Sequence, residues 1–382
     1  MNYLPHSPDQ FIRRQVTLLL ALVLLLAFSG CTTAAISPAP TTSAAITPTP
    51  IIPAAATPAG TTDASPTASV ANEQAVTVIP LSGPLAKDNA ELSGLAWAAT
   101  KSGDYLLLLP QYPGRFDDAI FALPKTDLLA YLDGAVTTPL EPQPIPFDAA
   151  GIPDQIDNFE GYESIAVDGN QVYLTIEARP GNQPVAYLVT GWLAEDLSRI
   201  TLESAYRAEI PAQAGLENMT DEAVLVWQDG VLTFHEANGN NVNPHPVAHR
   251  FDLVTLRPQP EVNFPNIEYR ITDTTAPDEL GRFWAINYFF PGDTKLKPAP
   301  DPLVARFGLG PTHATSPVVE RLVEFQFSSD GIHLTEVAPV TLQLLPDEEA
   351  RNWEGLVLLE TRGFLLATDK YPHTILAFVP RP

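Results

Sequence analysis

One form of strand end recurs five times along the chain. Each copy is a short apolar run that closes on polar residues and a Pro or Gly turn, as in YLLLLPQYPG from Tyr105, VYLTIEARPG from Val172, VLTFHEANGN from Val231, FWAINYFFPG from Phe283 and FLLATDKYPH from Phe364. The turn positions lie 67, 59, 52 and 81 residues apart, at Pro113, Pro180, Gly239, Pro291 and Pro372. Short strands bounded by turn residues at such intervals predict a chain built of repeated β units.

A second element precedes four of these stretches: SGLAW at Ser93, ESIAV at Glu163, EAVLV at Glu222 and EGLVLL at Glu354. The fourth unit, around YRITDTT, matches this element poorly. Each unit therefore begins with a hairpin, and further strands follow in most units. Repeats of about 50 to 80 residues that each form a small antiparallel sheet are typical of a β-propeller. The predicted fold class is all-β, a propeller of five blades, with a sixth blade left open by the 81-residue interval.

The last unit has room for only three strands before Pro382. The stretch AVTVIPL, residues 75–81, precedes the first unit and has no partner there. Pairing it with the last unit would complete that blade, close the ring and remove two exposed sheet edges. We therefore expect one propeller domain over residues 75–382.

The N-terminal residues have the composition of a targeting segment. Arg13 and Arg14 precede an apolar run from Val16 to Phe28, which is short for a membrane span and typical of a secretory signal. Small residues lead into Cys31, and this pattern resembles the lipobox of bacterial lipoproteins, in which the cysteine is lipidated. An ordinary cleaved signal with a chance cysteine is the alternative. We expect a signal peptide over 1–30, a disordered Ala/Thr/Pro-rich tether over 31–74 and an extracytoplasmic, membrane-anchored protein.

The net charge limits the classes of molecule that the chain can bind, and the cysteine content excludes disulfides as a source of stability. Without residues 1–30 the chain has 19 Lys and Arg against 44 Asp and Glu, a net charge of about −25. This balance argues against nucleic acid and against anionic headgroups, so membrane contact is expected only through the lipid anchor. Cys31 is the only cysteine, so disulfides do not stabilise the fold. The charge balance favours cations or basic partners, and we expect a monomer.

Acidic residues recur at both ends of the repeated hairpin. They start the first strand at Glu163, Glu222 and Glu354, and they end the second at Glu177, Glu236 and Asp369. In a hairpin the start of one strand lies beside the end of the next, and in a propeller the first strands line the central channel. The six carboxylates should therefore meet at one mouth of the axis.

Carboxylates brought this close repel one another unless a cation or a basic side chain lies among them. Oxygen ligands without thiols favour Ca²⁺ over Zn²⁺. The sequence thus predicts calcium, with Glu163, Glu222, Glu354 and Asp369 as ligands. The alternative is that some of the acids face solvent or pair with Arg179 and Lys370.

The stretches SGLAW, NFEGYESIAV with VYLTIEA, and NWEGLVLLETRGFLLATDKYP resemble the blade-start motifs of the phytase-like propeller family, which is often labelled esterase-like. The resemblance covers most of the range from Leu92 to Pro380. Strand starts of this kind also occur in other propeller families, including calcium-dependent lactonases. The resemblance implies a propeller, calcium at the axis, and hydrolysis of a phosphate or other ester. Unlike that family, this chain has no cluster of Lys and Arg near the proposed rim, so phytate is not the expected substrate.

Two functions remain open from the sequence. The first is a calcium-dependent ester or phosphoester hydrolase, with Glu177 or Glu236 as general base and Lys370 or Arg179 stabilising a developing oxyanion. The second is a non-catalytic envelope propeller that binds a ligand or partner at its acidic mouth. The chain contains no Gly-x-Ser-x-Gly nucleophile elbow. Whether the protein is an enzyme therefore stays open at this point.

The run HEANGNNVNPHPVAH holds His235, His245 and His249. Its Asn, Gly and Pro content predicts a loop with histidines at the surface or in turns, rather than a zinc site.

Overall fold

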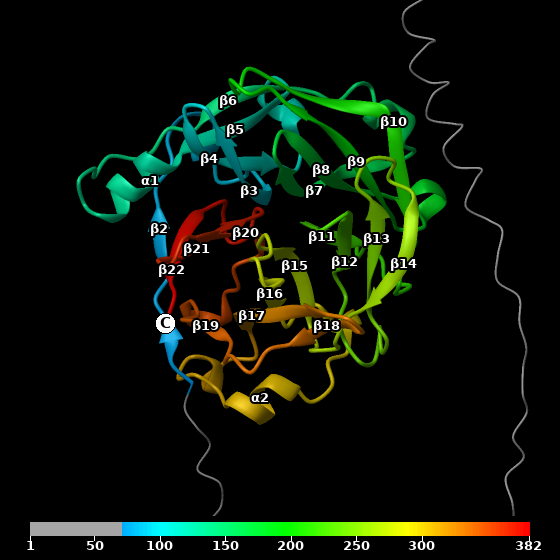
Figure 1. Ribbon diagram of the computed structural model, residues 1–382. Helices are drawn as coiled ribbons and strands as arrows, with labels where there is room; N and C mark the ends of the chain where they lie inside the picture. The colour runs from blue at the N-terminus through cyan, green and yellow to red at the C-terminus, as the bar shows by residue number, and fades with distance from the viewer. Residues whose placement is uncertain (1–70) are drawn as a thin grey trace, which may run out of the picture. The chain divides into compact units, whose positions relative to one another are not determined.

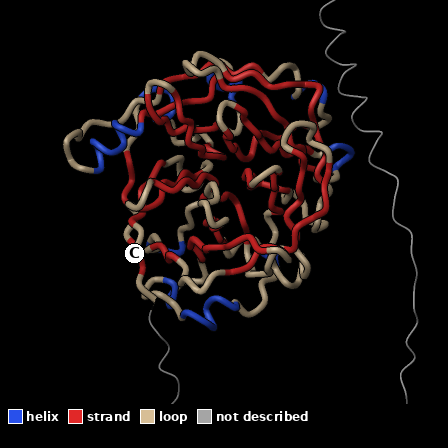
Figure 2. The backbone as a smooth tube through the Cα atoms, in the orientation of Figure 1, coloured by secondary structure: helices blue, strands red, loops and turns tan. Residues whose placement is uncertain are grey.

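The computed structural model describes residues 71–382, which form five antiparallel blades around a central axis (Figure 1). Cys31, the predicted signal peptide and the predicted tether up to residue 70 lie outside the described residues. Strands dominate, and two short α-helices, α1 (Lys125–Leu132) and α2 (Pro302–Phe307), lie at the periphery (Figure 2). None of the helices in residues 71–382 is long and apolar enough to span a membrane.

The first three blades run in chain order from an inner to an outer strand. The first three blades consist of β3 (Leu92–Thr100), β4 (Gly103–Pro110), β5 (Ala119–Pro124) and β6 (Gln143–Asp148); β7 (Phe159–Asp168), β8 (Gln171–Ala178), β9 (Val185–Leu193) and β10 (Ile200–Ile210); and β11 (Asp221–Trp227), β12 (Gly230–His235), β13 (Val247–Asp252) and β14 (Pro258–Asn263). Outer strands β6 and β10 pair in parallel, so the first two blades form one continuous sheet.

The fourth blade accounts for the long interval between turn positions. It consists of β15 (Arg270–Thr274), β16 (Arg282–Phe289) and β17 (Val319–Ser328), and the two ends of β17 pair separately with β18 (Gly331–Leu334) and β19 (Val340–Leu342). The connection from β16 to β17 holds α2, so no sixth blade occurs among the described residues. A short strand, β1 (Glu73–Gln74), pairs in parallel with β19, so the predicted end of the tether at residue 74 is wrong: these two residues belong to the propeller.

The fifth blade is completed from the N-terminal side, as the sequence predicts. It consists of β20 (Trp353–Leu359), β21 (Gly363–Thr368), β22 (Leu376–Pro380) and β2 (Thr77–Ile79). Strand β2 pairs antiparallel with β22, with Val78 opposite Ala377. The inner strands β3, β7, β11, β15 and β20 contact one another in that order, and β20 contacts β3. The five-bladed ring is therefore closed.

A separate apolar cluster fills each of the five spaces between neighbouring blades. Between the fourth and fifth blades, for example, the rings of Trp284 and Phe364 meet edge to face at 5.2 Å. Middle strands are covered on both faces, which explains why consecutive residues such as Leu106 to Leu109 are all buried. The stability of the ring thus comes from packing between blades, and the continuous apolar runs in the sequence reflect that double burial.

Candidate axial site

The starts of the inner strands and the ends of the second strands enclose a cavity of about 910 Å³. Five of the six predicted carboxylates line it, and the sixth, Glu236, lies fully buried beside it. Acidic side chains outnumber basic ones in the lining by nine to three: Glu160, Glu163, Glu177, Glu222, Asp293, Glu348, Glu349, Glu354 and Asp369 against Arg270, Lys295 and Lys370. The sequence prediction that these acids converge at the axis agrees with this geometry.

A repeated backbone irregularity places the acids on the inner strands. In β7, β11 and β20 the register with the next strand shifts across Glu163, Glu222 and Glu354, respectively. Strand β3 has the same shift across Ser93, and β15 has one between Ile271 and Thr274. A bulge leaves one residue unpaired and turns its side chain away from the regular alternation. The recurring Glu of the sequence motif is this bulged residue.

The hairpin partners predicted from the sequence interact in pairs. Burial, followed by repulsion from Glu177, raises the pKa of Glu163 well above its usual value. The pKa of Glu354 rises for the same two reasons, with Asp369 as its neighbour. Burial and then repulsion from Glu236 raise the pKa of Glu177 to about 8. Glu177 therefore retains its proton at neutral pH, and burial disfavours the charged forms of Glu163 and Glu354.

Arg270 lies among these acids and was not predicted from the sequence. It begins β15, is largely buried, and forms ion pairs with Glu236 and, at 3.3 Å, with Asp293. Burial alone disfavours the charge of Arg270, but the neighbouring carboxylates, Glu236 and Glu222 first, raise its pKa. The fourth unit, whose match to the motif is poor, thus supplies the basic side chain among the acids.

The four predicted calcium ligands do not form a ready metal site. Within residues 71–382 no group of three His, Cys, Asp or Glu side chains could hold a metal ion. Glu163 accepts a hydrogen bond from Gln111 at 3.0 Å, and Glu354 accepts one from Asn352. Each of these two hydrogen bonds engages one carboxylate oxygen that a metal ion would otherwise use. We therefore assign no step of the chemistry to calcium.

The two predicted basic residues are placed differently. Arg179 donates hydrogen bonds to Glu160 at 2.9 Å and to Asn218 at 3.0 Å, and it is not part of the cavity lining. Lys370 lines the cavity with a half-exposed side chain, 4.0 Å from Asp369. Of the two, Lys370 is the one that can reach a bound molecule.

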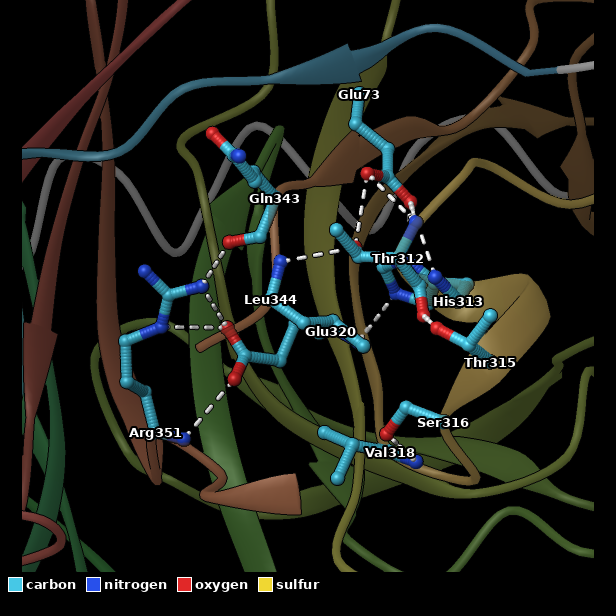
Figure 3. A network of polar contacts seen from close by, with 10 residues as sticks. All are labelled: Glu73, Thr312, His313, Thr315, Ser316, Val318, Glu320, Gln343, Leu344 and Arg351. Carbon is cyan, nitrogen blue, oxygen red and sulfur yellow. Dashed lines mark hydrogen bonds and ion pairs between the residues drawn. The ribbon is translucent and has the colours of Figure 1, made fainter. Parts of the chain in front are cut away.

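A buried polar network holds the start of β20 in place (Figure 3). Glu73 of β1 accepts a hydrogen bond from His313 Nδ1 at 2.9 Å, and His313 Nε2 accepts one from the Glu320 amide at 3.3 Å. The Glu320 carboxylate in turn accepts hydrogen bonds from Arg351 at 2.8 Å and from the Trp353 indole at 2.7 Å. Trp353 directly precedes Glu354, so the network fixes the segment of β20 that carries the Glu354 side chain.

Asp273 is a second axial residue that was not predicted. Its carboxylate accepts hydrogen bonds from the Leu356 amide at 2.7 Å and from the Ser164 hydroxyl at 3.1 Å, and the backbone of Leu95 and Thr274 also donates to it. These donors belong to the fifth, second, first and fourth blades. One carboxylate therefore connects four of the five blades on the axis.

The prediction that the histidines lie in a surface loop is wrong for two of the three. His235 ends β12 and His249 lies in β13, where the chain pairs antiparallel, and both side chains are buried. Their Nδ1 atoms lie 3.3 and 2.8 Å from the carboxylate of Asp221. These contacts hold the pKa of Asp221 below its usual value despite burial. Only His245 is exposed, because the loop is confined to the residues between the two strands.

No protein-family model matches the chain, and no curated protein matches it. Among solved structures it is similar to a glucose dehydrogenase, at 13% identity and a TM-score of 0.41 over 80% of this chain and 99% of that one. It is also similar to the GH62 α-L-arabinofuranosidase catalytic domain of Coprinopsis cinerea, at 9% identity and a TM-score of 0.44 over 82% and 98% of the two chains. A GH43_1 enzyme from Xanthomonas citri gives 11% identity and 0.42 over 79% and 91%. Likenesses this distant assign neither a family nor a function.

Proposed function

We propose that the protein is a hydrolase that uses general acid–base catalysis in the axial cavity. The observation that carries this proposal is Glu177, which lines the cavity, is only 3% exposed and has a buried carboxyl oxygen, Oε1, with no hydrogen-bond partner within residues 71–382. Its pKa of about 8 leaves it protonated at neutral pH. A protonated carboxyl group inside a cavity can donate its proton to a leaving-group oxygen.

Asp369 and Lys370 supply the remaining roles. Asp369 Oδ1 is also buried without a partner in the described part of the chain. Burial raises the pKa of Asp369, which makes it a stronger base, and Lys370 opposes that shift. In ester hydrolysis, Asp369 accepts a proton from the attacking water while the water oxygen bonds to the carbonyl carbon. Lys370 stabilises the oxyanion, and Glu177 protonates the alcohol oxygen as the C–O bond breaks. Glu236, paired with Arg270, acts by raising the pKa of Glu177.

The charge of the cavity favours a neutral or cationic ester over a phosphoester. Nine acidic side chains against three basic ones repel a phosphate group. The resemblance to the phytase-like family supports ester hydrolysis as a class of reaction, while the lining opposes that family's highly anionic substrate.

We expect Glu177→Gln to lower turnover of a responsive aryl ester by about 100-fold or more, because the amide cannot donate the leaving-group proton. In the parent protein, turnover should fall as pH rises through about 8, since the protonated form of Glu177 is lost there. A panel of aryl esters, aryl phosphates and aryl glycosides, assayed between about pH 5 and 9, measures both effects.

Glu279→Gln is the matched control, because Glu279 is exposed and lies outside the cavity lining. Turnover that is unchanged in Glu177→Gln would refute the assignment of Glu177. No turnover of any compound in the panel would favour the second candidate, a non-catalytic ligand-binding propeller. That candidate is supported by the same buried acids without partners in a large cavity.

We further propose that the propeller is tethered to a membrane outside the cytoplasm through lipid on Cys31. The motif SGC after an apolar segment supports this proposal. Expression of Cys31→Ser should move the protein from the membrane fraction to the soluble fraction, and mass spectrometry of the parent should show an acylated N-terminus. Unchanged membrane retention without acyl mass would contradict it.

A further inference from the structure

We propose that the axial cavity selects ligands that carry two or more ammonium groups, such as aliphatic polyamines or oligosaccharides of amino sugars. The inference rests on the proposed function for the location of the site. It concerns binding, so it can be tested without any turnover.

The negative charge of the lining is not balanced by the basic side chains within it. Arg270 is held in ion pairs, and the Lys295 ammonium donates to the backbone carbonyl of Glu217. The third basic residue of the lining, Lys370, forms a long ion pair with Asp369, with 4.0 Å between Nζ and the carboxylate oxygen. A cavity with this excess of carboxyl groups attracts cations and repels anions.

Two buried carboxyl oxygens without partners point to hydrogen-bond donors in the ligand. Glu177 Oε1 belongs to the end of β8, and Asp369 Oδ1 follows β21, so they come from the second and fifth blades. Their residues are 3% and 7% exposed, and both line the cavity. An ammonium group has three donors and no acceptor, and its positive charge lowers the pKa of a neighbouring carboxyl group. A bound ammonium group therefore favours the ionised form of Glu177, which is protonated in its absence, and donates to the carboxylate. Two acceptors on separate blades favour a ligand with separated ammonium groups.

Aromatic rings at the cavity add a second kind of contact for cations. Phe290 and Tyr371 line the cavity and are 47% and 60% exposed. The Lys370 ammonium already lies 5.7 Å from the centre of the Tyr371 ring. An ammonium group over such a ring face is attracted by its quadrupole. The rim can therefore hold a second cationic group while the first reaches the buried acids.

The spread of the acids also distinguishes this ligand class from a metal ion. A metal ion requires several oxygens that converge on one point, and residues 71–382 contain no such group of three. A polyamine carries its charges at separate positions along an extended molecule. The acids likewise lie at separate positions around the lining of the cavity. The geometry thus favours an extended polycation.

Isothermal titration of the whole mature chain tests the proposal with spermidine and with the β-1,4 dimer of glucosamine. Cellobiose and the N-acetylated dimer serve as neutral controls. We expect both amines to bind at least about 10-fold more weakly at about 300 mM salt than at about 20 mM, because screening weakens the attraction. The neutral sugars should bind at least about 100-fold more weakly than the glucosamine dimer.

Glu177→Gln and Asp369→Asn should each weaken amine binding about 10-fold, while Glu279→Gln should leave it unchanged. Circular dichroism shows whether each variant is folded, and the two site variants provide independent tests. Binding of only one amine supports the proposal and identifies the source of the ammonium groups. Equal binding of the neutral sugars, retained affinity in both folded site variants, or displacement of spermidine by one bound calcium ion would overturn it.

The two proposals can fail separately. Amine binding without turnover of any ester would leave this inference standing and remove the hydrolase. If Glu177-dependent turnover of a neutral ester occurred without any amine binding, the hydrolase would stand and this inference would be refuted.

Discussion

Replacing Arg270 by methionine is expected to lower the free energy of unfolding by about 3–5 kcal/mol at neutral pH, because it removes the buried partner of several carboxylates. Glu236 is fully buried in its ion pair with Arg270, and Glu222 and Glu354 also contribute to the charge around it. Urea denaturation followed by circular dichroism measures the difference. The loss should exceed that of any exposed ion pair in the propeller.

The difference in free energy of unfolding between the parent and Arg270→Met should increase as pH rises. In the parent, the positive charge of Arg270 lowers the pKa values of Glu222 and Glu236. Removing the guanidinium therefore raises these folded-state pKa values further above those in the unfolded chain. A raised carboxyl pKa contributes stability that is present at low pH and is lost as pH rises through the folded value. The variant should therefore approach the stability of the parent in acid and fall further below it as pH rises towards alkaline values.

Arg282→Met is the matched control, because Arg282 forms an exposed ion pair with Asp278 at 2.7 Å. Such a pair contributes at most about 1 kcal/mol. If the two variants were equally stable at neutral pH, Arg270 would not be the counter-ion of the acidic cluster.

The sequence predicted the propeller and its closing strand because both depend on local, repeated patterns. A hairpin with an acid at each end is visible in the chain wherever it occurs, and four copies define the blade. The unpaired stretch at residues 75–81 identified its partner by elimination, and β2 lies where that reasoning placed it.

The compensation of charge within the ring could not be predicted in the same way. Arg270 and Asp273 belong to the unit whose match to the motif is poor, and each acts through residues of other blades. Their roles appear only when blades distant in sequence meet at the axis. The mismatch of YRITDTT with the other units was itself the signal, since a blade that departs from the repeat supplies what the others lack.

The histidines show a related limit. His235 and His249 are separated by a loop rich in Asn, Gly and Pro, and that composition suggests exposure for the whole run. The pairing of β12 with β13 places Thr233 opposite His249, which buries both histidines against Asp221. Composition predicted the turn, whereas the burial of its flanks depends on the neighbouring strands.

Asp273→Ala should destabilise the propeller by about 3 kcal/mol or more, the second large effect that we expect. The substitution leaves the buried Leu356 amide and Ser164 hydroxyl without their acceptor, and each such loss costs about 1–3 kcal/mol. Because its four donors belong to four blades, the variant should also loosen the axis. Hydrogen exchange of the amides at Leu95, Thr274 and Leu356 should accelerate more than exchange at the blade edges.

Two further variants test whether the loss of stability comes from the hydrogen bonds of Asp273 on the axis or from the removal of any acidic side chain. Asp168→Ala removes an exposed carboxylate from the end of β7 and should change stability by no more than about 0.5 kcal/mol. Asp273→Asn keeps the size of the side chain and one acceptor oxygen, but its NH₂ group faces a donor, so it should fall between alanine and the parent. Stability of Asp273→Ala within about 0.5 kcal/mol of the parent would show that packing between blades holds the axis without this carboxylate. Local exchange that is unchanged at Leu356 would lead to the same conclusion, because that amide loses its acceptor directly.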